Sequence, residues 1–227
     1  MLPFLFSRAV FKVVKRKPLK WKLNQKFPGI FFFPHMKLEE YLLFKELCRN
    51  KKVFLEYGSG GSTIQLLKGG KKVFSVESNP GFYHYMNGIG LVQRASGHSL
   101  TYKLVDLGDT DQWGIPLTTE KEENWSRYYE EAWNDIEAQN EKVDVVFIDG
   151  RFRVCCCLYS VLKVVEQGWQ DTLFIIHDFW HRKHYHVVLQ FLQEHKSAAS
   201  LGAFTLKKGI DVAEVKNLIE AYAAEKV

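Results

Sequence analysis

Short apolar segments rich in β-branched and aromatic residues alternate with helical patterns along most of the chain. We expect strands over residues 52–57, 72–77, 101–107, 142–150, 172–178 and 203–208. We expect helices over residues 37–48, 62–70, 79–87, 125–139, 153–167 and 183–195, and a closing helix from residue 211. This alternation implies right-handed crossovers and a mostly parallel sheet with helices on both faces.

The expected fold is therefore α/β, a Rossmann-like doubly wound sheet. The 227 residues suit one well-buried domain and are too few for two large ones. We assign residues 37–227 to this domain and residues 1–36 to a basic, aromatic N-terminal arm. In such a sheet, ligands bind at the carboxyl ends of the strands, beside the point where the strand order reverses.

The positive charge of the protein is concentrated in the arm. Residues 1–37 hold nine Lys or Arg and no acid. The rest of the chain carries 22 bases and 26 acids, a net charge of −4. Because a nucleic-acid-binding domain usually has a basic face, this distribution argues against nucleic acid as a partner.

Three interpretations of the arm remain open. It can form a short helix on an anionic membrane, act as an organelle transit peptide, or pack its aromatic side chains on the domain. No apolar run approaches the roughly 20 residues that cross a bilayer. We therefore expect a cytoplasmic protein, associated with a membrane only if the arm makes that contact. The oligomeric state is left open.

The four cysteines do not predict a disulfide framework or a zinc site. Three of them are neighbours, Cys155, Cys156 and Cys157, and no CxxC spacing is present. On a helix, the side chains of neighbouring residues point about 100° apart and cannot converge on one metal ion. We expect buried thiols.

The segment "VFLEYGSGGST" (53–63) is an apolar run that ends in an acid and continues as a turn with small side chains. Three glycines allow the backbone to approach a ligand closely: Gly58, Gly60 and Gly61. Ser62 or Thr63 can cap the helix that follows. A dinucleotide fingerprint would have glycine where Thr63 stands, and Glu56 would repel a pyrophosphate. Glu56 suits a ligand that offers an ammonium group.

A second acid, Glu77, lies 21 residues after Glu56, at the end of the next expected strand. A carboxylate at this position can accept hydrogen bonds from both hydroxyls of a ribose. A ligand with an amino-acid end, a ribose and no pyrophosphate matches S-adenosylmethionine.

The sequence resembles the class I S-adenosylmethionine-dependent methyltransferases. "LEYGSGGST" is similar to their first motif, "VFSVESN" to the second, and "VDVVFIDGRFR" to the motif of the fourth strand. Together with "DLGDTDQWGIP" and "HDFWHRKHY", these segments resemble a subgroup of small methyltransferases, over about residues 36–190. The resemblance implies cofactor contacts at Glu56, Gly58, Ser59, Gly60, Ser62, Thr63, Glu77 and Ser78, and a weaker match at Asp106 on the adenine side.

The usual sheet of this superfamily has seven strands and ends in an antiparallel hairpin. Only about 30 residues follow the helix expected near residue 190. That length suits one strand and one helix, so we expect a C-terminal region that lacks the full hairpin.

Candidates for the chemistry follow the fourth and fifth expected strands. Methyl transfer to a hydroxyl needs positioning and a base. Asp149 ends one strand, and His177 and Asp178 end the next. His177 or His181 can act as a general base with Asp178 orienting the ring, and Arg151 can hold an anionic group of the acceptor. At least two of the five histidines between residues 177 and 195 are expected to have no role.

A divalent ion, Mg or Mn, is a less favoured addition to this site. Some small-molecule O-methyltransferases of the superfamily bind such an ion with acids at the fourth and fifth strand ends, where Asp149 and Asp178 lie. In those enzymes asparagine typically follows the second acid, whereas this chain has Phe179.

The leading hypothesis is methylation of a small-molecule or glycoconjugate acceptor at oxygen, with an Asp or His general base. The alternatives are a nicotinamide-dependent oxidoreductase and a relative that binds S-adenosylmethionine without turnover. The aromatic segment 111–133 is interpreted first as core and second as a lid over the cofactor.

Overall fold

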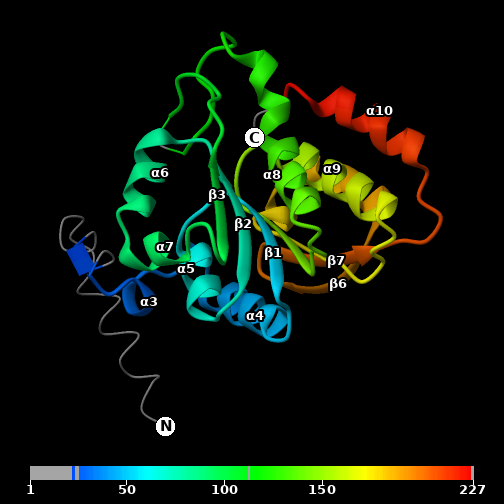
Figure 1. The fold of residues 1–227 in the computed structure, drawn as a ribbon. Helices are drawn as coiled ribbons and strands as arrows, with labels where there is room; N and C mark the ends of the chain where they lie inside the picture. Colours follow the sequence, from blue (N-terminus) through cyan, green and yellow to red (C-terminus); the bar gives the residue numbers. More distant parts are fainter. Residues whose placement is uncertain (1–21, 24–25, 112, 226–227) are drawn as a thin grey trace.

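A computed structural model describes residues 22–23, 26–111 and 113–225, and its central element is one seven-stranded sheet (Figure 1). The strands are β1 (Val53–Tyr57), β2 (Lys72–Glu77), β3 (Leu100–Leu104), β4 (Val145–Ile148), β5 (Leu173–Ile176), β6 (Leu192–Ala198) and β7 (Leu201–Leu206). The helices are α3 (Pro28–Phe31), α4 (Leu38–Cys48), α5 (Gly61–Lys68), α6 (Pro80–Asn87), α7 (Gly90–Ala95), α8 (Trp125–Ala138), α9 (Arg153–Glu166) and α10 (Val212–Tyr222). Three 3₁₀ helices are η1 (Glu122–Asn124), η2 (Phe179–His181) and η3 (Lys183–Gln190).

The strands are arranged in the order β3-β2-β1-β4-β5-β7-β6. The pairs among the first five are parallel, and β7 runs antiparallel to both β5 and β6. The order reverses between β1 and β4, so the ends of these two strands flank the switch point at which ligands of such sheets bind. The predicted doubly wound α/β fold is confirmed.

Each face of the sheet has its own hydrophobic core. One core joins the strands to α8, α9 and α10, and includes Trp125, Trp133 and Phe152. The other joins them to α4, α5, α6 and α7, and includes Phe44 and Ile64. Figure 1 shows these two groups of helices on opposite sides of the sheet. Because both faces are covered, the strand ends are the places left for polar chemistry.

The expectation of a missing C-terminal hairpin is wrong. β6 and β7 form that hairpin, and the helix expected over 183–195 is instead η3 followed by β6. The physical reason is that β6, "LQEHKSA", is an edge strand with most of its side chains exposed. It therefore lacks the apolar run by which the inner strands are predicted.

Other expectations about burial are confirmed. All four cysteines are buried and free. The aromatic residues of α8 belong to the core, which agrees with the first interpretation of segment 111–133. Trp113, in the same segment, is exposed. In the arm, Phe32 is buried in the α4–α7 core, and Phe27 and Phe33 are exposed; residues 1–21 lie outside the described part. None of the described helices combines the length and apolar character needed to cross a bilayer.

Candidate active site

Glu56, the second-last residue of β1, is a completely buried carboxylate. Its Oε2 accepts hydrogen bonds from the hydroxyls of Thr63 at 2.5 Å and Ser75 at 2.9 Å. Its Oε1 is buried and has no hydrogen-bond partner among the described residues. Burial raises the pKa of Glu56 to about 7, although the hydroxyls of Ser62, Thr63 and Ser75 act in the opposite direction. Oε1 can therefore accept a hydrogen bond from a cationic donor.

The glycine turn brings β1 close to the end of β4. Gly58 has a φ of +88°, and a Cβ there would lie 2.7 Å from the backbone of Gly150. A Cβ at Gly61 would lie 2.1 Å from the backbone of Phe33. At Gly60, in contrast, a Cβ would meet nothing within 4 Å. Gly60 is therefore the glycine that faces open space, as a backbone cradle for a ligand requires.

Glu77 ends β2 and is 7% exposed. Its Oε1 accepts from the backbone N–H groups of Ser78 at 2.8 Å and Asn79 at 2.9 Å, and its Oε2 accepts from the hydroxyl of Ser59 at 2.8 Å. Burial raises the pKa of Glu77 against the effect of these hydrogen bonds. The Ser59 hydroxyl also lies 2.6 Å from the hydroxyl of Tyr102, a residue that the motifs did not indicate.

The structure brings the other predicted cofactor residues together near these two carboxylates. Asp106 is exposed and follows Val105, whose backbone N–H donates to the carbonyl of Glu77. The carboxylate of Asp106 pairs with Lys121 and accepts from the backbone N–H of Gly108.

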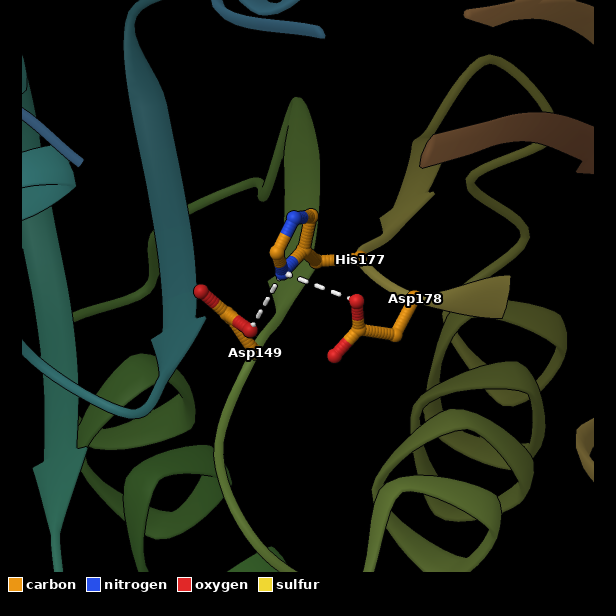
Figure 2. A group of neighbouring side chains, drawn as sticks. All are labelled: Asp149, His177 and Asp178. Carbon is orange, nitrogen blue, oxygen red and sulfur yellow. Dashed lines mark hydrogen bonds and ion pairs between the residues drawn. The ribbon is translucent and has the colours of Figure 1, made fainter. Parts of the chain in front are cut away.

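A second cluster lies at the ends of β4 and β5, and Figure 2 shows it. His177 Nδ1 is 2.9 Å from Asp149 Oδ1 and 3.9 Å from Asp178 Oδ1. Asp178 has a φ of 59°. This left-handed conformation costs a non-glycine residue about 1–3 kcal/mol. Figure 2 shows the carboxylate of Asp178 directed toward the ring of His177.

Glu40, from α4, holds the other side of the His177 ring. Its Oε2 lies 3.4 Å from His177 Nε2 and accepts from the backbone N–H of Lys37 at 2.8 Å. Its Oε1 accepts from both the N–H and the hydroxyl of Ser200, in the β6–β7 turn. Burial acts to raise the pKa of Glu40, but the hydrogen bonds from Ser200 and Lys37 lower it to about 2. Glu40 is therefore an anion opposite His177.

The imidazole consequently lies between two carboxylates. Burial acts to lower the pKa of His177, but the hydrogen bond and charge of Asp149, followed by the charge of Asp178, raise it. With Asp149 at Nδ1 and Glu40 at Nε2, neither ring nitrogen is left for a substrate proton. His177 is therefore better suited to holding the ends of the strands in position than to acting as a general base.

Arg153, the first residue of α9, is the buried cation of the cluster. Its guanidinium is 3.1 Å from Asp149 Oδ1 and 3.6 Å from Asp178 Oδ2. It also donates to the carbonyls of His177 at 2.6 Å and Gly150 at 3.0 Å. Burial acts to raise the pKa of Asp149, but the Arg153 charge and the His177 contacts lower it. Arg153 thus joins the ends of β4 and β5 and keeps Asp149 ionised.

The remaining candidates take different positions. Arg151 donates its backbone N–H to the Tyr128 hydroxyl at 3.3 Å, and its Nε is buried without a hydrogen-bond partner among the described residues. His181 is exposed, in η2, outside the Asp149–His177–Asp178 cluster. His184 lies near Glu225, and the His186 ring stacks on Phe179.

Within the described residues, Asp149, His177 and Asp178 are a group whose ligand atoms lie within 4.8 Å of one another, as a metal site would require. However, Mg and Mn prefer oxygen ligands, and one of these three donors is an imidazole. The guanidinium of Arg153 also already contacts both carboxylates. A divalent ion would share its ligands with a buried cation, so these residues fit a metal poorly.

The comparison with solved structures finds a methyltransferase-like protein from Silicibacter pomeroyi, with 26% sequence identity and a TM-score of 0.67. The similarity covers 83% of this chain and 96% of that one. Two structures of MycE methyltransferase from the mycinamycin biosynthetic pathway, both with Mg and SAH, are more distant, at 11% and 12% identity and TM-scores of 0.45 and 0.43. They match 85% and 86% of this chain, which spans only 56% and 57% of theirs.

Comparisons with protein-family models and with curated proteins find no match. The strand order and the likeness to the Silicibacter pomeroyi protein define a protein with the methyltransferase fold. They support assignment of the chain to the methyltransferase superfamily, as its motifs predict.

Proposed function

We propose that this protein is an S-adenosylmethionine-dependent methyltransferase that acts on a hydroxyl of a small-molecule or glycan acceptor. The observation that carries the proposal is the pair of buried carboxylates, Glu56 and Glu77, at the ends of adjacent strands beside the open side of Gly60. The MycE structures, although distant, contain SAH, the demethylated product of this cofactor.

The chain's own residues suit the three parts of the cofactor. The unpartnered Oε1 of Glu56 would accept from the ammonium group of the methionine end. Glu77 would accept from the ribose hydroxyls, and the backbone at Gly60 would approach the nucleoside. When bound, the cofactor supplies a methyl group already activated as a sulfonium, so the protein mainly positions the acceptor and excludes water.

The acceptor side would be the cluster at the ends of β4 and β5. Asp178 has the most exposed carboxylate of that cluster, with 32% of its side chain accessible. We assign it the role of accepting the proton of the acceptor hydroxyl. Asp149, His177 and Glu40 hold the ends of the strands in place, and the partly exposed side chain of Arg151 would contact the acceptor. No metal is needed for these roles.

Two alternatives are less well supported. A nicotinamide-dependent oxidoreductase would place a pyrophosphate at the turn, where Thr63 replaces the third glycine of the fingerprint and Glu56 is negative when ionised. A relative without turnover would keep Glu56 and Glu77 but would not need the strained Asp178 beside a charged cluster.

A thermal-shift comparison of SAH, NAD and ATP tests the proposal. SAH is expected to raise the melting temperature, and NAD and ATP are not. An acceptor screen with a labelled methyl donor then tests turnover. Asp178→Asn should retain SAH binding and lose transfer; stabilisation by NAD alone would favour the oxidoreductase.

A further inference from the structure

The large hydrophobic side chains that the described residues expose come from only two segments, 27–42 and 113–117. Their exposed fractions range from 38% to 64%. We call these side chains the apolar collar: Phe27, Ile30, Phe33, Leu38, Leu42, Trp113 and Leu117. Isolated exposed apolar residues are normal, but their concentration in two segments marks an interaction surface.

The two segments of the collar meet. The rings of His35 and Trp113 are 6.4 Å apart, and Phe33 packs edge-on against Tyr41 with ring centroids 5.6 Å apart. Leu38 and Leu42 are one turn apart on α4, so they lie on the same face of that helix. The His35–Trp113 contact places the two segments of the collar next to each other.

The collar also adjoins the cofactor side of the candidate site. The backbone of Phe33 covers Gly61, at the start of α5. On the other segment, the carbonyl of Gly114 accepts from the Ser78 hydroxyl at 3.1 Å, next to Glu77. The two segments thus contact the turn after β1 and the turn after β2.

The charges around the first segment are mostly positive. Lys22, Lys26 and Lys37 are exposed. On α4, Glu39 is exposed, Glu40 is buried, and Glu46 pairs with Lys196 at 2.6 Å. By sequence, residues 1–37 contain nine bases and no acid. An apolar face beside such a basic segment complements an anionic lipid surface, whereas a second copy would bring two basic arms together.

We propose that the first segment of the apolar collar, together with the exposed side chains of Lys22, Lys26 and Lys37, docks on an anionic membrane surface. Apolar side chains would enter the boundary between headgroups and acyl chains, and the lysines would contact the headgroups. The docking does not depend on the proposed reaction, so either can fail without the other.

Flotation of the full chain with lipid vesicles tests the proposal, with vesicles of phosphatidylcholine alone and with added phosphatidylglycerol. The wild type is expected to bind the anionic vesicles, and less so at high salt. Ile30→Ser/Leu42→Ser should reduce the partition coefficient by about tenfold or more, because two apolar side chains no longer enter the lipid. Lys22→Ser/Lys26→Ser should weaken binding to anionic vesicles.

The matched control is Lys207→Ser/Lys208→Ser, which removes an exposed basic pair at the end of β7, outside both collar segments, and should bind like the wild type. Circular dichroism checks that each variant is folded. Equal binding by the Ile30/Leu42 variant and the wild type, or no binding to either vesicle, would overturn the proposal. A dimer in analytical ultracentrifugation that the Ile30/Leu42 substitutions abolish, without vesicle binding, would identify a second copy as the occupant and also overturn it.

Discussion

The Nε2 of His177 lies 3.4 Å from the Oε2 of Glu40, a residue 137 positions earlier in the chain. Through this contact, α4 reaches the end of β5, and Asp149 occupies the other ring nitrogen. His177 is thus held in place by contacts on both sides of its ring.

Glu40→Gln should lower turnover while leaving SAH affinity unchanged, because Glu40 acts on the acceptor side of the site. It should also reduce the free energy of unfolding by about 1–3 kcal/mol, as expected for a buried charged hydrogen-bonding group. Kinetics and urea denaturation measure the two effects. Glu46→Gln, on the exposed side of the same helix, is the control and should change stability by no more than about 0.5 kcal/mol. Normal turnover in Glu40→Gln would remove the positioning role.

Arg153→Met should destabilise the protein by about 3–5 kcal/mol, because it leaves the Asp149 and Asp178 carboxylates without their buried cation. Chemical denaturation measures the loss. The control is Arg127→Met, which removes an exposed pair with Glu131 on α8 and should cost less than about 1 kcal/mol. Similar losses in both variants would show that Arg153 does not hold the strand ends together.

Gly60→Ala should fold normally and bind SAH more weakly, because the added Cβ meets no protein atom within 4 Å but enters the open side of the turn. Gly58→Ala should instead destabilise the fold by at least about 1 kcal/mol, since its φ is +88° and its Cβ would contact the Gly150 backbone. Thermal denaturation and calorimetry separate the two effects. Wild-type SAH affinity in Gly60→Ala would mean that no ligand approaches there.

Stability should depend on pH through Glu56. Its pKa rises from an ordinary 4.5 to about 7 on folding, so the folded state holds a proton that the unfolded state releases between these values. The Glu56 contribution is therefore present below pH 4.5 and falls as pH rises toward 7, by roughly 3 kcal/mol in all. Urea denaturation at pH 5 and pH 7.5 should show this loss in the wild type relative to Glu56→Gln. A difference between the two proteins that does not change with pH would contradict the raised pKa.

The sequence predicts the inner part of the fold well for a physical reason. Buried parallel strands are continuous apolar runs, and the residues that end them, such as Glu56, Glu77 and Asp149, are placed by the run itself. Their common location at one edge of the sheet follows from the parallel arrangement.

The residues that the sequence does not reveal make contacts with residues far away in the sequence. Glu40 and Ser200 are 160 positions apart, and neither belongs to a motif. Glu40 reads as one more acid in an amphipathic helix, and Ser200 lies beside an edge strand without an apolar run. In the sequence Arg153 is one more charge after β4, and its burial depends on how α9 packs against the ends of β4 and β5.

Calorimetric titration of the wild type and Glu77→Ala with SAH tests the central claim most directly, since Glu77 is assigned to the ribose hydroxyls. The account predicts that the wild type binds SAH and that Glu77→Ala binds it at least about tenfold more weakly, as the loss of charge-assisted hydrogen bonds implies. Asp171→Asn, in the exposed pair with Lys142, should bind like the wild type. Equal affinity of Glu77→Ala and the wild type, or no binding of SAH by the wild type, would contradict the account.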